Sequence, residues 1–536
     1  MSTPAAASSA LATIDIDPTV YARRWKILTV LCTSLVVVIV GNTALNVALP
    51  TLARELNASI SAQQWMVDAY GLVFAGLLLT AGTIGDRYGR KGTLQFGLTV
   101  FLGGSLFAAF MDSASAVIVG RAIMGFGAAF VMPATLSILT NVFPQHERGR
   151  AIAVWAGISG AGAAVGPVAS GFLLEHFSWG SVFLVNVPII ALALVAGYIL
   201  LPKSRDPHPD RLDPLGALLS IAGLGALVYA IIEAPRHGWG SNHSLTWFAI
   251  AAVVLSLFMV WELRSANPML NLRYFLDPRF GVAAGVITLI FFAMFGFFFL
   301  MTQYFQLVLG YGTLEAGLKQ LPFAAVMVIC APQSPKLAAK FGVNRVVAGG
   351  LLGVAVAMLG FTMVGTNTAY VELLPVMVIM SAGMSLTIPS MTGSIMSAVP
   401  MGKAGVGSAM NDTTRELGGA LGVAVLGSLV ASRYGTRLGP SIRSLSASLR
   451  GKAEESLAGA LQAAGQIGGP SGQRVADGAR TAYVSGMHLA ALVAACVAVL
   501  ASVLVYHRLP STNPHVNRAE VGEQSSDLVV EVGPAR

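Results

Sequence analysis

The sequence predicts an all-α integral membrane protein with 14 transmembrane helices, arranged as two six-helix, pseudo-symmetric halves with two helices inserted between them. Composition is the first observation: of 536 residues, 55% are hydrophobic and 11% are charged, whereas a soluble domain carries about 25% charged residues. Second, apolar segments of about 20 residues, the length that crosses a bilayer core, recur along the chain. Third, the two halves share an internal repeat.

Each apolar segment is expected to form one membrane-spanning helix. The segments lie at 25–48, 64–84, 93–111, 115–139, 150–173, 181–201, 213–233, 245–264, 280–307, 317–337, 345–365, 371–393, 405–431 and 482–507. The resulting plan has a tail at 1–24, a first half at 25–201, inserted helices with flanking loops at 202–279, a second half at 280–508 and a disordered tail at 509–536. Residues before the first segment lack a signal-peptide core and cleavage pattern, so that helix is expected to be retained.

Basic residues cluster on alternate loops, as in Arg148 with Arg150 and Lys336 with Lys340. The positive-inside rule assigns these loops to the cytoplasm, which predicts a multi-pass protein of the inner, or plasma, membrane with both termini cytoplasmic. The predicted external loop 433–480 disagrees, because it carries seven basic residues. Its apolar residues recur at helical spacing from Leu438 to Leu449. This loop is therefore expected to be either an amphipathic helix on the outer membrane surface or a disordered segment.

The internal repeat relates the ends of corresponding helices. Gly89 and Gly342 end similar small-x-basic-x-Gly segments 253 residues apart, and an offset of 256 carries Pro144 onto Pro400 and Gly162 onto Gly418. Duplicated halves with a site near the midplane are typical of alternating-access transporters.

A set of glycines and charged residues at fixed spacing follows the second segment, in Gly82-Thr-Ile-Gly-Asp86-Arg87-Tyr-Gly89-Arg90-Lys91. Topogenic charge alone needs basic residues but neither an aspartate nor spaced glycines, so we interpret this loop as a conformational latch between the halves. The fifth segment carries Gly162, Gly166, Pro167 and Gly171 at spacings that let another helix approach. They predict a hinge, with ordinary tight packing as the alternative.

Ionisable residues within the segments are candidates for proton coupling, because charge in a bilayer requires a partner or a water-filled cavity. They are Asp68, Arg121, Asp412, Arg415 and Glu416. Asp412 and Glu416 are four residues apart, on one side of a helix, beside Arg415. The alternatives are snorkelling for Arg121, a solvated helix end for the Asp412 cluster and a first-turn acid on the helix dipole for Asp68.

Uncharged polar residues within spans normally point inward, so Asn42, Gln303, Tyr304 and Gln306 are candidates for a substrate cavity. The last three follow an aromatic stretch from Phe291 to Phe299, for which lipid contact is the alternative.

These motifs resemble the major facilitator superfamily and, within it, the fourteen-helix drug:proton antiporters of bacteria, over nearly the whole chain. Further similar segments are Asn46-Val-Ala-Leu-Pro50, Asn186-Val-Pro188 and Arg415-Glu-Leu-Gly418. The resemblance implies proton transfer through Arg121, a latch at Asp86 and Arg90, a hinge or seal at Gly166 and Pro167, and lipophilic, often cationic, substrates. The chain departs from the family at Gly41, where an acidic residue is usual. A coupling carboxylate is therefore expected elsewhere, at Asp68 and the Asp412 cluster.

The leading hypothesis is a proton-driven multidrug exporter that confers antibiotic resistance and works by alternating access. Its predicted partners are small lipophilic substrates, protons and the lipid bilayer, with no nucleic acid, and it is predicted to act as a monomer. The alternatives are an exporter of a native lipid or secondary metabolite and a non-transporting membrane sensor. The sequence contains no phosphate-binding loop, nucleophile or metal-ligand spacing, which predicts no enzymatic activity, no metal and no cofactor, with the proton gradient as energy source.

Overall fold

The computed structural model describes residues 17–56, 60–206, 213–265, 268, 270–442 and 445–511. Within these ranges the chain is helical, without strands, and 14 helices are long and apolar enough to cross a membrane. The predicted fold class is confirmed. Most of both predicted tails, including the tail expected to be disordered, lies outside the described residues.

Six spans form the first half. Their helices are α1 (Pro18–Glu55), α2 (Ile60–Tyr88), α3 (Arg90–Ala109), α4 (Ala114–Val142), α5 (Gln145–His176), and α6 (Ser181–Leu184) with α7 (Asn186–Leu200). Capping side chains explain where two of these helices begin. The Asp17 side chain accepts a hydrogen bond from the amide of Thr19 at the start of α1, and the Ser113 side chain accepts one from the amide of Ala116 at the start of α4.

Two inserted helices follow, α8 (Pro214–His237) and α9 (Asn242–Arg264), each begun by a capping side chain, Asp213 and Ser241. Helix α8 packs against α2 and α16, so it touches both halves, while α9 packs mainly on α8. Most of α9 consequently remains on the outside of the protein as an apolar surface suited to lipid.

The second half is more broken than the first. Its elements are η1 (Leu272–Leu276), α10 (Pro278–Gln303), a π-helical turn η2 (Tyr304–Val308), α11 (Thr313–Leu318), α12 (Leu321–Cys330), η3 (Ala331–Gln333), α13 (Ser334–Phe341), α14 (Val343–Phe361), α15 (Tyr370–Ala398), η4 (Met401–Lys403), α16 (Ala404–Ile442), α17 (Ala447–Glu455), α18 (Leu457–Ile467) and α19 (Gly469–Arg508). The tenth span is divided among α11, α12, η3 and α13, and Pro322, Pro332 and Pro335 each stand near the start of one of these pieces. Proline removes a backbone donor and interrupts a continuous helix.

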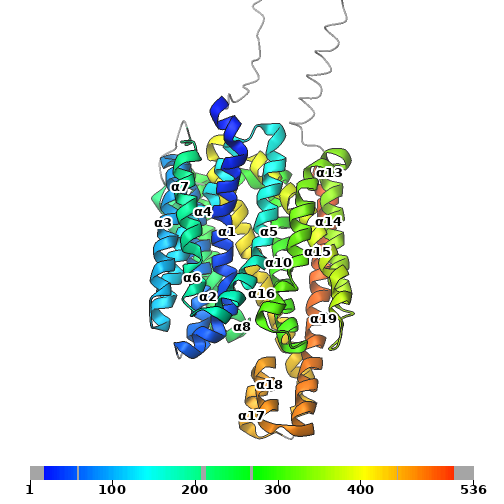
Figure 1. The fold of residues 1–536 in the computed structure, drawn as a ribbon. Coiled ribbons are helices and arrows are strands. Elements are labelled where there is room, and N and C mark those ends of the chain that lie inside the picture. The colour runs from blue at the N-terminus through cyan, green and yellow to red at the C-terminus, as the bar shows by residue number, and fades with distance from the viewer. Residues whose placement is uncertain are drawn as a thin grey trace, which may run out of the picture.

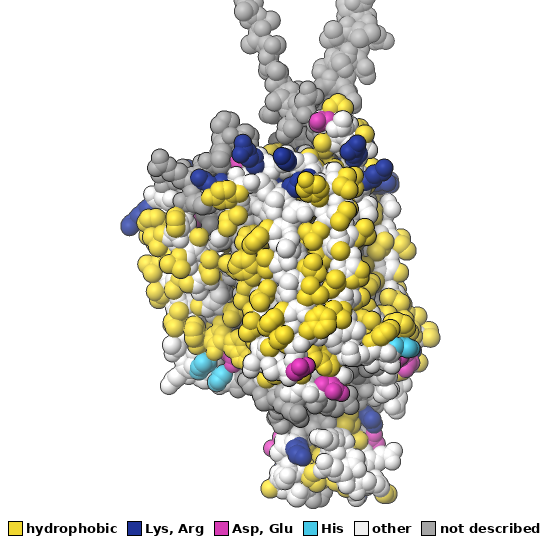
Figure 2. Space-filling view, turned by 60° about the vertical axis from the view of Figure 1, so that its left-hand side comes forward, with side chains coloured by type: hydrophobic (Ala, Val, Ile, Leu, Met, Phe, Trp, Pro, Cys, Tyr) yellow, Lys and Arg dark blue, Asp and Glu magenta, His cyan; other side chains and the backbone are white. Residues whose placement is uncertain are grey.

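The long helices run side by side, and both described termini lie at the same end of the bundle (Figure 1). On the face shown in the space-filling view, an apolar band covers the middle of the bundle, and basic side chains gather at the end that carries the termini (Figure 2). This distribution is what a bilayer-embedded protein requires, because apolar side chains face hydrocarbon and charges face the aqueous boundary.

The segment 433–480 differs from both expectations. It is helical, and at the end opposite the termini α16 and α19 extend past the bundle and carry α17 and α18 (Figure 1). Leu438, Ile442, Ala453 and Leu457 form its buried core, and no large hydrophobic residue of this segment is exposed in the described part. A small folded protrusion therefore replaces the predicted surface helix or disordered loop, because its apolar residues cover one another instead of lipid.

Candidate transport site

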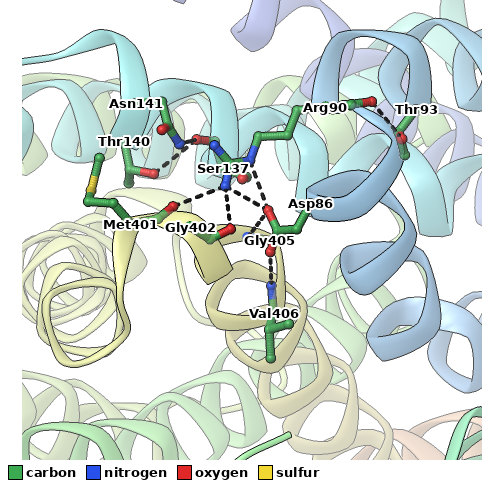
Figure 3. A network of polar contacts seen from close by, with 11 residues as sticks. Asp86, Arg90, Thr93, Ser137, Thr140, Asn141, Met401, Gly402, Gly405 and Val406 are labelled. Atoms are coloured by element: carbon green, nitrogen blue, oxygen red, sulfur yellow. Dashed lines mark hydrogen bonds and ion pairs between the residues drawn. The ribbon is translucent and has the colours of Figure 1, made fainter. Parts of the chain in front are cut away.

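The predicted latch joins α2 to the start of α16, from opposite halves (Figure 3). Asp86 Oδ1 accepts the amide of Gly405 at 2.9 Å, and Oδ2 accepts the amide of Val406 at 3.2 Å. A carboxylate placed there satisfies free amides and complements the positive end of the helix dipole. Asp86 therefore acts as the N-terminal cap of a helix more than 300 residues later in the chain.

Arg90 completes this contact. It is only 1% exposed, its Nε donates to Asp86 Oδ1 at 2.8 Å, and its Nη2 donates to the carbonyls of Met401 at 3.0 Å and Gly402 at 2.9 Å. A buried guanidinium needs partners for several donors at once, and the carbonyls before α16 provide them.

The glycines of the latch have separate roles. A Cβ on Gly82 would lie 2.5 Å from the Gly405 carbonyl oxygen, so α2 and α16 meet backbone to backbone there. Gly89 has φ of +116°, in the region that favours glycine, and starts α3. Arg87 lies 5.6 Å from the Tyr88 ring, and Lys91 Nζ donates to the Tyr198 carbonyl at 2.6 Å. Lys91 therefore ties the loop to α7 and not to the other half.

Sequence reasoning missed a second layer of the latch. The Arg90 amide donates to the Ser204 carbonyl at 3.0 Å, and the Asp206 amide donates to the Asp86 carbonyl at 2.8 Å. The chain that leaves α7 toward the insert thus pairs with the latch backbone. It missed Gly405 as well, although the repeat of Pro144–Gly149 in Pro400–Gly405 signalled a matching helix start.

The glycines of α5 contact two different neighbours. A Cβ on Gly162 would touch Ile39, and one on Gly166 would overlap Thr43, both on α1 of the same half. A Cβ on Gly171 would instead lie 3.2 Å from Leu314 in α11, across the interface. Pro167 lies inside the helix. Tight packing within one half thus accounts for Gly162 and Gly166, and contact between halves involves Gly171.

Arg121 is 0% exposed, which contradicts the snorkelling alternative. Its Nε donates to the Met66 carbonyl at 2.9 Å, Nη1 to the Gly41 carbonyl at 3.1 Å and Nη2 to Asn42 Oδ1 at 2.9 Å. The guanidinium also lies 4.3 Å from the Tyr70 ring. Helix α4 therefore presents a buried cation that connects α1 with α2.

The cluster on α16 lies deep inside the protein. Asp412 is 1% exposed and eight residues beyond the helix start at Ala404, so the solvated-end alternative is wrong. Arg415 Nη1 pairs with Asp412 Oδ1 at 3.4 Å, while Asp412 Oδ2 is buried without a hydrogen-bond partner in the described part of the chain. Glu416 is half-buried on the following turn.

Arg415 also links the two halves. Its Nη2 donates to Ser159 Oγ of α5 at 2.6 Å, and its guanidinium lies 4.6 Å from the Phe291 ring and 5.4 Å from the Trp155 ring. Ser159 and Arg415 are 256 residues apart, the repeat offset, so this bond joins repeat-equivalent positions. Nothing in the local sequence indicated Ser159 as its partner.

The structure places the remaining candidate residues in different environments. Asp68 lies in the third turn of α2, which begins at Ile60, so it is not a first-turn acid. Tyr304 is buried and its hydroxyl donates to the Gly365 carbonyl at 2.7 Å, so it belongs to the packed core and not to a substrate cavity. Asn42, Gln303 and Gln306 are half-buried, which is compatible with their prediction.

Two six-helix halves, joined by the contact around Asp86 and Arg90 and by a buried charged contact, have the architecture that is typical of alternating-access membrane transporters. The sequence profile of the Major Facilitator Superfamily matches residues 31–423. The chain belongs to this superfamily, as its motifs predicted.

The chain is 36% identical over 486 residues to the multidrug efflux pump LfrA of Mycolicibacterium smegmatis, a match that covers 90% of this chain and 96% of that protein. It is 30% identical over 493 residues to the tetracenomycin C resistance and export protein of Streptomyces glaucescens, covering 90% of each. The solved proton:xylose symporter XylE shares the fold, with a TM-score of 0.59, 14% identity, and coverage of 92% of this chain and 97% of that chain.

Proposed function

We propose that this protein is a secondary active transporter that exports small lipophilic toxic compounds in exchange for protons. Its superfamily membership and its similarity to proteins named as efflux pumps and resistance proteins support this proposal. We further propose that it works as a monomer in the inner membrane with both termini in the cytoplasm, where the basic end of the bundle would lie. The proton gradient then supplies the energy, with no covalent chemistry and no cofactor.

The observation that carries the proposal is the Asp412, Arg415 and Ser159 contact. It places an ionisable carboxyl group inside the protein, paired with Arg415, and Arg415 itself makes the bond to Ser159 that crosses between the halves. A change in the charge of Asp412 alters the attraction that holds Arg415, and Arg415 is also bound to the other half. Protonation and rearrangement of the halves are thereby linked through one side chain.

The test is proteoliposome transport under an imposed pH gradient, with substrate-induced proton release measured for Asp412→Asn, Glu416→Gln and Asp68→Asn separately. We expect Asp412→Asn to abolish proton release while substrate still binds. If all three variants keep wild-type proton release and efflux, the coupling group lies elsewhere in the protein.

A second candidate is export of a secondary metabolite made by the producing cell. The tetracenomycin C resistance and export protein, similar over 90% of this chain, favours it. Deleting the gene from the organism that encodes this protein, and comparing the metabolites that the mutant and the wild type secrete, distinguishes this candidate from general drug efflux.

A further inference from the structure

Asn411 directly precedes the buried carboxyl group of Asp412 on α16, and its own side chain is 0% exposed. Its Nδ2 donates to Asp412 Oδ1 at 3.3 Å, and its Oδ1 accepts from Thr392 Oγ1 of α15 at 3.0 Å. Burying an amide costs free energy unless it is hydrogen-bonded. Here the nitrogen and the oxygen each have a partner, so the surroundings match an amide at this position.

The two partners of Asn411 fix the orientation of its amide. Oδ1 of Asp412 only accepts hydrogen bonds, so the Asn411 nitrogen must face it, and the Asn411 oxygen then faces the Thr392 hydroxyl, which donates. The reverse orientation would place two accepting oxygens against each other. Because Thr392 lies on α15, two helices together hold the amide in place.

The two oxygens of Asp412 consequently differ. Oδ1 accepts from Asn411 Nδ2 and, at 3.4 Å, from Arg415 Nη1, whereas Oδ2 is buried without a hydrogen-bond partner in the described residues. A protonated carboxyl group has one hydroxyl oxygen, which donates, and one carbonyl oxygen, which accepts. Oδ1 faces two donors and serves as the accepting oxygen, which leaves Oδ2 as the oxygen that can carry a proton.

Few charged groups act on this carboxyl group. In the described part of the chain, the charged groups that interact with Asp412 are Arg415 and Glu416, both on α16. The helices packed against α16 are α2, α4, α8, α10, α15 and α19, and none of their described charged groups, Asp68 of α2 and Arg121 of α4 included, interacts with Asp412. Asn411 is therefore the uncharged group that orients Asp412 beside Arg415.

The first half has the same join between helices without the acid. At the repeat offset of 256, the equivalent of Asn411 is Trp155, and its Nε1 donates to Thr135 Oγ1 of α4 at 3.2 Å. The equivalent of Asp412 is Ala156. Joining this position to a threonine of the preceding span therefore does not require an amide. An amide is required only in the second half, where the side chain must also donate to a carboxyl group.

We propose that Asn411, held by Thr392, is a positioning residue that keeps Oδ1 of Asp412 beside Arg415 and leaves Oδ2 as the atom that binds the coupling proton. Loading transfers a proton from a hydronium ion to Oδ2, which forms the O–H bond and leaves a water molecule, and release returns the proton to water. Because Oδ2 is buried in this structure, both steps need a rearrangement that admits water. This inference rests on the proposed proton-coupled export and deepens it.

The first experiment is infrared difference spectroscopy of the purified full-length protein as the pH is lowered. The C=O stretch of protonated Asp412 is the band that Asp412→Asn removes. If the proton is on Oδ2, the carbonyl oxygen is Oδ1, and Asn411→Leu, of similar size, takes away one of its donors and should move the band to higher wavenumber. If the proton is on Oδ1, the carbonyl oxygen is Oδ2, which has no donor, and the band should not move.

The second experiment measures transport of ethidium, a lipophilic cationic dye, by the full-length protein in liposomes. Asn411→Leu should lower efflux driven by an imposed pH gradient about tenfold, the size of the effect expected for one hydrogen bond to a charged group. Exchange of the dye without a gradient moves no net proton and should stay near the wild-type rate. Thr392→Val should give a smaller loss and a smaller band shift in the same directions, while Thr392→Ser retains the hydroxyl and should behave like the wild type.

Thr387→Val is the matched control. Thr387 lies on α15, is 0% exposed, and donates its hydroxyl to the Gly383 carbonyl of the same helix at 2.9 Å. The change removes a buried hydroxyl from the same helix without touching the contact between Thr392 and Asn411. Both the Asp412 band and gradient-driven efflux should match those of the wild type.

The outcomes separate this inference from the exporter function. The role of Asn411 is overturned by an unmoved band in Asn411→Leu, by equal losses of gradient-driven efflux and exchange, or by a wild type that shows no Asp412 band; ethidium efflux by the wild type then still supports the exporter. Thr392→Val decides the question if Asn411→Leu does not fold. A wild type that moves no ethidium under the gradient contradicts the exporter function, while the infrared measurement, which needs no substrate, still decides where the proton binds.

Discussion

Two repeat-equivalent contacts join the halves, and among the described residues only the first of them contains an ion pair. In the first, Asp86 and Arg90 hold the start of α16. In the second, α13 meets α5, and the positions 253 residues after Asp86 and Arg90 are Ala339 and Val343. The backbone of the turn is kept in both, because Gly89 and Gly342 have φ of +116° and +89°.

The two contacts also differ in how closely their helices pack. Gly82 and Gly405 meet backbone to backbone, whereas their equivalents are Pro335 and Gly149, where a Cβ on Gly149 would lie 3.4 Å from Pro335 Cβ. Hydrogen bonds to a buried ion pair are lost steeply with distance, while apolar packing permits sliding. We therefore expect the first contact to control opening and the second to act as a pivot.

Asp86→Asn should have the largest effect on transport of the four substitutions, because it changes the first contact directly. It leaves Arg90 buried without its carboxylate, which costs about 3 kcal/mol, or about a hundredfold in the ratio of open to closed protein. Spin labels at Tyr88 and Phe341, exposed repeat-equivalent sites, report the separation of the halves. The variant should show longer distances and slower efflux at normal expression. Wild-type distances and rates would show that the charge does not hold the contact.

Gly405→Val should have the second-largest effect on transport. Its Cβ would lie 2.5 Å from the Gly82 carbonyl oxygen and 2.8 Å from Asp86 Cγ. Overpacking of this kind costs about 2 kcal/mol, so efflux should fall about thirtyfold. The same spin-label pair separates a displaced α16 from simple misfolding, since an unfolded variant gives a broad distribution. A variant with wild-type efflux would mean that the backbones approach less closely during transport.

Ser159→Ala tests the hydrogen bond between Ser159 of α5 and Arg415 of α16, which also joins the two halves. It removes the acceptor of Arg415 Nη2 on the opposite half, and a hydrogen bond to a charged group contributes about 1.5 kcal/mol. We expect about a tenfold loss of transport in a protein that still folds, because Arg415 keeps its pair with Asp412. Threonine at 159 retains the hydroxyl and serves as the control. Equal loss in both variants would assign the effect to packing.

Gly149→Ala should have the smallest effect. Its added methyl group meets only Pro335 at ordinary contact distance, so efflux should change less than about twofold, as for most conservative surface changes. A loss as large as that of Gly405→Val would remove the distinction between the controlling contact and the pivot.

Hydrophobicity and length were sufficient to locate the spans, because each segment must satisfy its own backbone inside the bilayer whatever its neighbours are. The same reasoning failed where tertiary contacts override local pattern. Leu438, Ile442, Leu445 and Leu449 recur at helical spacing, yet α16 ends at Ile442 and α17 begins at Ala447, and only Leu438 and Ile442 of the four are buried in the protrusion. Tyr304 looked suited to a cavity but packs in the core, because nothing in its neighbourhood indicated the Gly365 carbonyl.

The sequence by itself determined the membrane class, the fourteen spans, the repeat and the latch residues of the first half, since these are properties of local composition and spacing. Only the tertiary structure decided which groups meet: Asp86 with the start of α16, Arg415 with Ser159, and Arg121 with an asparagine and two carbonyls. The first two of these partners are more than 250 residues apart. Local patterns do not specify such pairs, because they form only where packed helices bring their faces together.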